Sequence, residues 1–151
     1  FYSNDVVMSG DAITQINITL KSSPDILLGG RIIYWAAGWN EFEQEGKKFI
    51  IPYCEGWFLA CTKKVWDNLG GFDPIYGKYD YEDVDLSTTA LWNGYDLVGL
   101  NSPFLSHLGA QTAKYSDERM EHTKKNRELY IKKWADKFSE LFGRLEGNLH
   151  A

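Results

Sequence analysis

The order of apolar and polar positions in the first 34 residues predicts a strand, a helix and a second strand. Residues 1–8 are expected to form the end of a strand that runs into a polar turn. After Asp11, apolar side chains recur three and four positions apart, which is the period of a helix that ends near Ser22. Residues 26–34 are mostly apolar and β-branched, interrupted by a glycine pair, and should form the next strand. This succession indicates an α/β sheet.

The pattern is less regular in the middle of the chain. Residues 35–48 mix charge with glycine without a clear period, so a loop or an irregular hairpin is expected, whose aromatic side chains either cover the core or stack on sugars. Residues 49–51 and 53–62 are apolar enough for strands, with Pro52 marking a break or an edge. Residues 63–68 suit a short helix that a glycine pair ends.

Helical periods return in the second half of the chain. Residues 83–92 have the apolar spacing of a helix and are followed by Asn-Gly, a common helix end. Residues 95–100 are strand-like, and residues 104–108 follow after a turn. A strongly charged stretch from residue 116 to about residue 143 again has the period of a helix. More helix than strand is therefore expected toward the C-terminus.

The composition changes between residues 111 and 115, which makes this segment the best candidate for an internal boundary. We expect residues 1–113 to form one unit and residues 114–151 to form a C-terminal helical extension. A length of 151 residues is that of a single domain with a core of its own. With 44% hydrophobic and 25% charged residues, the composition is that of an ordinary soluble globular protein.

Charge, hydropathy and cysteine usage limit the partners and the compartment. The net charge of -5 argues against nucleic acid as a partner, because phosphate binding would need a basic face. No run approaches a membrane span, and the first residues lack the pattern of a signal peptide. Cys54 and Cys61 would point to opposite faces of one strand, so no disulfide is expected between them. Reduced thiols favour the cytoplasm, with peripheral membrane association left open.

An acidic cluster stands at the start of the predicted helix near residue 83. Four carboxylates, Asp80, Glu82, Asp83 and Asp85, lie within six positions. The helix dipole favours anionic side chains at this end, and a loop that leads into a helix can direct them into a cleft. A calcium loop of the EF-hand kind is excluded because Val84 and Leu86 stand at positions that need oxygen ligands and the required glycine is absent. Helix capping alone remains the alternative to chemistry.

The cluster belongs to a longer series of motifs. In order, these are Gly56-Trp57-Phe58-Leu59, Lys63-Lys64, Leu69-Gly70-Gly71-Phe72-Asp73, Glu82-Asp83-Val84-Asp85-Leu86, Gly94-Tyr95 and His107. Their order and spacing resemble those of family 2 glycosyltransferases, which are nucleotide-sugar-dependent enzymes of the GT-A fold. The resemblance covers most of residues 1–113. It departs at Thr88-Thr89, where many relatives carry an arginine.

This resemblance implies both a fold and an activity. The fold would be α/β, part of a GT-A (Rossmann-like) mixed sheet flanked by helices, with the helical tail after it. The activity would be metal-dependent transfer of a sugar from a nucleotide-diphospho-sugar donor to a hydroxyl of a saccharide or glycan acceptor, with inversion. Asp83 would be the general base. Substrate-binding residues would be Gly56, Trp57, Glu82 and Asp85, with Trp57 as an apolar platform for a sugar face.

The resemblance also implies a metal site. Asp5 matches the last carboxylate of the family's short acidic motif, and His107 matches a histidine placed against the metal and the diphosphate. Without the resemblance, Asn4-Asp5 favours a turn and His107 favours a hydrogen-bonded core residue. Manganese or magnesium suits one carboxylate, one imidazole and phosphate oxygens better than zinc does.

Two other interpretations remain open. The chain could be a non-catalytic carbohydrate-binding module on a partial GT-A scaffold, with the 6 tryptophans and 9 tyrosines as its surface. It could also be a scaffold that needs only its core. Because the resemblance begins at the metal motif, we expect the chain to be the acceptor-side portion of a catalytic domain. The N-terminal, nucleotide-binding half would then be missing from it.

Overall fold

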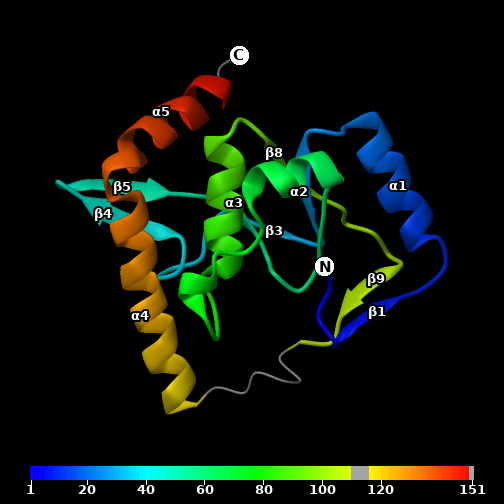
Figure 1. Cartoon of the computed structure of the whole chain (residues 1–151), viewed down its shortest axis with the longest axis horizontal. Helices are drawn as coiled ribbons and strands as arrows, with labels where there is room; N and C mark the ends of the chain where they lie inside the picture. Colours follow the sequence, from blue (N-terminus) through cyan, green and yellow to red (C-terminus); the bar gives the residue numbers. More distant parts are fainter. Residues whose placement is uncertain (110–115, 150–151) are drawn as a thin grey trace.

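The computed structural model describes residues 1–109 and 116–149, which form a mixed α/β arrangement of small sheets and helices (Figure 1). The largest sheet in these residues has the strand order β7-β2-β8. In it, β2 (Ile26–Gly29) runs parallel to β8 (Asp96–Gly99) and antiparallel to β7 (Leu59–Ala60). All four residues of β2 are buried, as expected for a strand with a neighbour on each side.

A two-stranded sheet and a helix stand at one end of the molecule (Figure 1). Strand β1 (Val6–Met8) pairs antiparallel with β9 (Leu105–His107). Helix α1 (Ala12–Ser22) follows β1 with the bounds that the sequence predicts, although the Asp11 side chain makes no capping hydrogen bond. The expected order of strand and turn is wrong, because the turn at Asn4-Asp5 comes before β1 rather than after it.

The predicted strand over residues 26–34 divides into two. After β2, the chain turns at Gly30 and continues as β3 (Ile32–Ile33), which pairs with β6 (Tyr53–Cys54) in a separate sheet. Residues 53–62 likewise divide between β6 and β7. Their cysteines are both free, as predicted. The Gly29 backbone lies so close to Cys54 that an added Cβ would stand 2.7 Å from the cysteine Cβ.

The segment expected to be a loop or hairpin is a hairpin. Strands β4 (Glu41–Gln44) and β5 (Lys47–Ile50) pair antiparallel across Glu45 and Gly46. Both of these turn residues have positive φ, 52° and 73°, which matches the twist of a two-residue hairpin. Phe42 and Phe49 from the two strands are buried, so at least this part of the aromatic segment covers the core.

The helices of the middle segment follow their local signals. Helix α2 (Lys63–Leu69) is capped by the Thr62 side chain and ends at Gly70, whose φ of 77° is the left-handed conformation that glycine favours. A short 3-10 turn, η1 (Pro74–Tyr76), leads toward α3 (Glu82–Trp92). Helix α3 runs through the centre of the molecule (Figure 1).

The predicted C-terminal helix is present but divided. Helix α4 (Asp117–Trp134) begins at its cap Ser116, and a 3-10 turn, η2 (Ala135–Lys137), separates it from α5 (Phe138–Leu149). Tyr130, Trp134 and Phe138 share a buried cluster with the hairpin and with α3. The proposed boundary between residues 113 and 114 lies outside the described residues. Within the described ranges, no helix is long and apolar enough to cross a membrane.

Candidate functional site

A cavity of about 590 Å³ gathers the predicted site residues from distant parts of the chain. Its lining includes Asp5, Gly56, Trp57, Glu82, Asp83 and His107. These residues come from the turn before β1, the β6–β7 connection, the start of α3 and the end of β9. Of the predicted site residues, only Asp85 is absent from this lining.

Asp83 lies in the first turn of α3 with its carboxylate held on both oxygens. Oδ2 accepts a hydrogen bond of 2.8 Å from the Gly56 amide, and Oδ1 accepts one of 2.8 Å from the Val84 amide. Burial, followed by the neighbouring Glu82 carboxylate, raises the pKa of Asp83 to about 7, against the opposing effect of the two amides. A carboxylate with such a pKa can exchange a proton near neutral pH.

Gly56 and Glu82 are both close neighbours of this carboxylate. An added Cβ at Gly56 would lie 3.1 Å from the Asp83 Cβ, so a side chain there would press on the acid. Burial raises the pKa of Glu82, with a further contribution from Asp80 and an opposing one from Arg119. The two adjacent acids therefore disfavour a doubly ionised state.

Asp5 and His107 meet at the other side of the cavity. The Asp5 Oδ2 atom lies 3.2 Å from His107 Nε2, although the two residues are far apart in the sequence. The Ser3 hydroxyl donates to Asp5 Oδ1, and the Leu108 amide donates to the Asp5 carbonyl oxygen. The register of the β1–β9 ladder brings the two side chains together, since Val6, the neighbour of Asp5, is opposite His107. The strand pairing, rather than any local motif, brings together the two residues that the resemblance assigns to one metal site.

The Trp57 indole supports His107. The two rings stack with centroids 5.0 Å apart and planes 5° from parallel. Its Nε1 donates to Glu55 Oε2 at 2.9 Å, and an added Cβ at Gly30 would lie 2.0 Å from the ring. One face of Trp57 is thus taken by His107, and close packing against Gly30 explains why that position has no side chain.

Asp85 points away from the cavity. Its side chain is 3% exposed, and it accepts hydrogen bonds from Lys133 Nζ at 2.8 Å and Trp134 Nε1 at 2.7 Å. Both donors belong to α4, so Asp85 joins α3 to α4. The structure gives Asp85 a contact between helices rather than a place beside the predicted substrate.

The residues present fit a divalent cation that a ligand helps to hold. Asp5 and His107 supply one oxygen and one nitrogen donor on the cavity wall. Across residues 1–109 and 116–149, no group of three or more His, Cys, Asp or Glu side chains is placed to hold a metal ion. A cation between Asp5 and His107 would therefore take its remaining ligands from phosphate or water, which suits manganese or magnesium.

Sequence reasoning missed two arginines on the cavity wall. Arg31 donates to both carboxylate oxygens of Glu55 at 2.6 and 2.7 Å, and Arg119 of α4 makes a paired contact with Asp80. Neither arginine belongs to a local motif, and Arg119 lies 39 residues from its partner. Only the fold brings these cations to the acidic cavity.

Comparisons with known proteins provide relatives but no activity. No protein-family model and no solved structure matches the chain. A segment of 65 residues is 34% identical to uncharacterized proteins of Mycobacterium bovis and Mycobacterium tuberculosis. It covers 42% of this chain and 25% of each relative. The chain thus spans about a quarter of the length of the relatives it matches.

Proposed function

We propose that this chain is the acceptor-side portion of a GT-A glycosyltransferase domain of family 2. The observation that carries the proposal is that Asp83 and the Asp5–His107 pair line the same cavity. One carboxylate with a pKa near neutrality and one candidate metal pair are the two groups that sugar transfer from a nucleotide diphosphate needs. The parallel β2–β8 pair supports the fold, since Gly30 and Arg31 bring the end of β2 to the cavity.

In the proposed reaction, Asp83 acts on the acceptor. The acceptor oxygen forms a bond to the anomeric carbon of the donor sugar while the bond from that carbon to the diphosphate oxygen breaks. The hydroxyl proton passes to the Asp83 carboxylate, which the Gly56 and Val84 amides hold in place. Manganese or magnesium held by Asp5 and His107 would supply positive charge against the departing diphosphate.

The test is a screen of the natural full-length protein against a panel of nucleotide-diphospho-sugars. Release of nucleoside diphosphate and transfer to saccharide acceptors are measured with manganese, with magnesium and with chelator. We expect metal-dependent turnover of at least one donor. Saccharide binding without turnover of any donor would instead identify a non-catalytic carbohydrate-binding module. Tyr34 and Trp35, 72% and 59% exposed beside the cavity residues Ile33 and Ala36, favour that second candidate.

The metal pair makes a separate prediction about donor binding. Asp5→Ala and His107→Ala should each weaken binding of a nucleotide diphosphate by about tenfold or more in manganese, because each removes one protein ligand. Neither substitution should change the weak binding of the nucleotide diphosphate that is measured in the presence of chelator. Calorimetric titration with and without manganese measures both quantities. Equal affinities of wild type and both variants in manganese would rule out this pair as the metal site.

A further inference from the structure

The segment just before the candidate base has an unusual backbone. Tyr79, Asp80 and Tyr81 have φ values of 56°, 51° and 77°, so three successive residues other than glycine are left-handed. L-residues seldom adopt this conformation, and it persists only where the surroundings impose it. Tyr81 is also the residue from which α3 begins, so this segment sets the direction in which Glu82 and Asp83 leave the turn.

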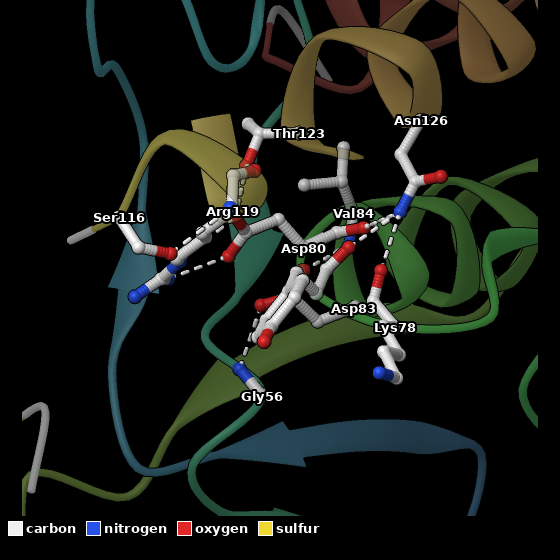
Figure 2. Close-up of polar contacts among 10 residues, drawn as sticks. Gly56, Lys78, Asp80, Asp83, Val84, Ser116, Arg119, Thr123 and Asn126 are labelled. Carbon is white, nitrogen blue, oxygen red and sulfur yellow. Dashed lines mark hydrogen bonds and ion pairs between the residues drawn. The ribbon is translucent and has the colours of Figure 1, made fainter. Parts of the chain in front are cut away.

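A single side chain from α4 lies at the centre of this segment. The Asn126 Nδ2 atom is 2.9 Å from the Tyr76 carbonyl oxygen, 3.1 Å from that of Lys78 and 3.0 Å from that of Asp80. It also donates to the Tyr79 carbonyl oxygen. Figure 2 shows the Asn126 amide pointing from its helix toward Lys78 and Asp80. Asn126 is 1% exposed, so its amide group is shielded from water.

The same helix also holds the Asp80 side chain. Arg119 donates to Asp80 Oδ1 at 2.7 Å and to Oδ2 at 3.2 Å, and Thr123 Oγ1 donates to Oδ2 (Figure 2). Residues 119, 123 and 126 are four and three positions apart, so they lie on one face of α4. One helix face thus contacts both the backbone and the side chain of the left-handed turn.

We propose that Asn126 is a positioning residue that fixes the left-handed turn at Tyr79–Tyr81 and so aims the Asp83 carboxylate at the Gly56 amide and into the cavity. The inference rests on the proposed function, since it assigns Asn126 a part in the reaction of Asp83. The Asn126 amide suits this place, because its NH2 group presents two N–H donors toward four carbonyl oxygens. An aspartate of the same shape would present an oxygen to them instead.

The test compares Asn126→Asp and Asn126→Ala with a matched control, Tyr130→Phe. The control removes a buried hydrogen bond of 2.7 Å between the same helix and Thr88. It keeps the aromatic ring that packs against Tyr81 and removes no hydrogen bond to the backbone of the turn. Two readouts are used: steady-state transfer, and the Gly56 amide resonance in glycine-labelled protein followed over pH. In wild type this resonance should titrate with Asp83, because the amide donates to its carboxylate.

We expect both Asn126 variants to lose the titration of the Gly56 resonance. Their kcat should fall by about 10²-fold, with KM for the donor within about twofold, because a shift of about 1 Å in a reacting group has an effect of this size. Tyr130→Phe should lower the melting temperature and leave both readouts at wild-type values. An unchanged Gly56 titration in folded Asn126 variants would overturn the proposal, as would an equal fall in kcat in Tyr130→Phe.

Two further outcomes are informative. If neither Asn126 variant folds, Thr123→Val is used instead, because it removes one contact of the same helix face to Asp80. It should lower kcat and weaken the Gly56 titration, each by less than is expected for the Asn126 variants. Wild-type values of both in Thr123→Val would then count against the proposal. If wild type turns over no nucleotide sugar, the proposed function fails, but the Gly56 titration still decides whether Asn126 positions Asp83.

Discussion

Replacing Asp83 with asparagine should abolish most sugar transfer while the protein stays folded and still binds the donor. Asparagine has the shape of aspartate, and its single carbonyl oxygen can keep one of the two hydrogen bonds, from the Gly56 or the Val84 amide, while its NH2 group faces the other amide. It cannot take a proton from the acceptor hydroxyl. The expected fall in kcat is about 10²–10⁴-fold, the usual contribution of a general base. Transfer assays under saturating donor, with calorimetric titration of the donor, measure the two effects separately.

The pH profile is the control for this assignment. A base must be ionised to accept the proton, so wild-type kcat should rise with pH through the Asp83 pKa of about 7. The residual rate of Asp83→Asn should lack this rise. If the variant keeps near-wild-type turnover, or if the same rise persists in it, another group is the base.

Replacing Asp85 with alanine should instead destabilise the fold. The change leaves the Trp134 indole N–H without its acceptor and removes one of the two carboxylates that Lys133 contacts, the other being Asp73. Removing one partner of a buried ion pair costs about 3–5 kcal/mol, and we expect about 3 kcal/mol because the Lys133 side chain is 34% exposed and can regain water. Urea unfolding followed by tryptophan fluorescence measures the change.

The matched control for Asp85 is Asp67→Ala. That change breaks an ion pair with Lys63 in which both side chains are mostly exposed, 55% and 86%. Its expected effect is about 0.5 kcal/mol or less. Similar free energies of unfolding for Asp85→Ala and Asp67→Ala would show that the contact between helices contributes little.

Elements with local signals were predictable from the sequence. Helices α1, α2 and α3 match their predicted ranges to within a residue or so, because the helical period and the residues that end a helix act within a few positions. Only α2 among the three has both a side-chain cap, from Thr62, and a glycine stop, at Gly70. The division of residues 26–34 into two strands was not predictable, since it depends on close packing of Gly29 and Gly30 against Cys54 and Trp57. These contacts are made by residues far along the chain.

The candidate site shows the same division between local and distant information. Asp83 could be singled out because its motif is contiguous, whereas Arg119 reaches Asp80 only through the packing of α4. The assignment of Asp85 to the substrate could have been avoided from the sequence alone. Residues two positions apart on a helix point about 160° away from each other, so Asp83 and Asp85 are not expected to face one cavity.

The packing of α4 against the turn at Tyr79–Tyr81 also bears on how the protein is made. Synthesis runs from the N-terminus, so residues 1–109 leave the ribosome before α4 does. Until then the nascent chain lacks the Asn126 amide and the Arg119 guanidinium that hold the turn. We therefore expect the cavity to acquire its final shape only when α4 has been translated. A chain released from the ribosome before α4 is translated would contain the whole acidic motif but would not orient Asp83 toward the cavity.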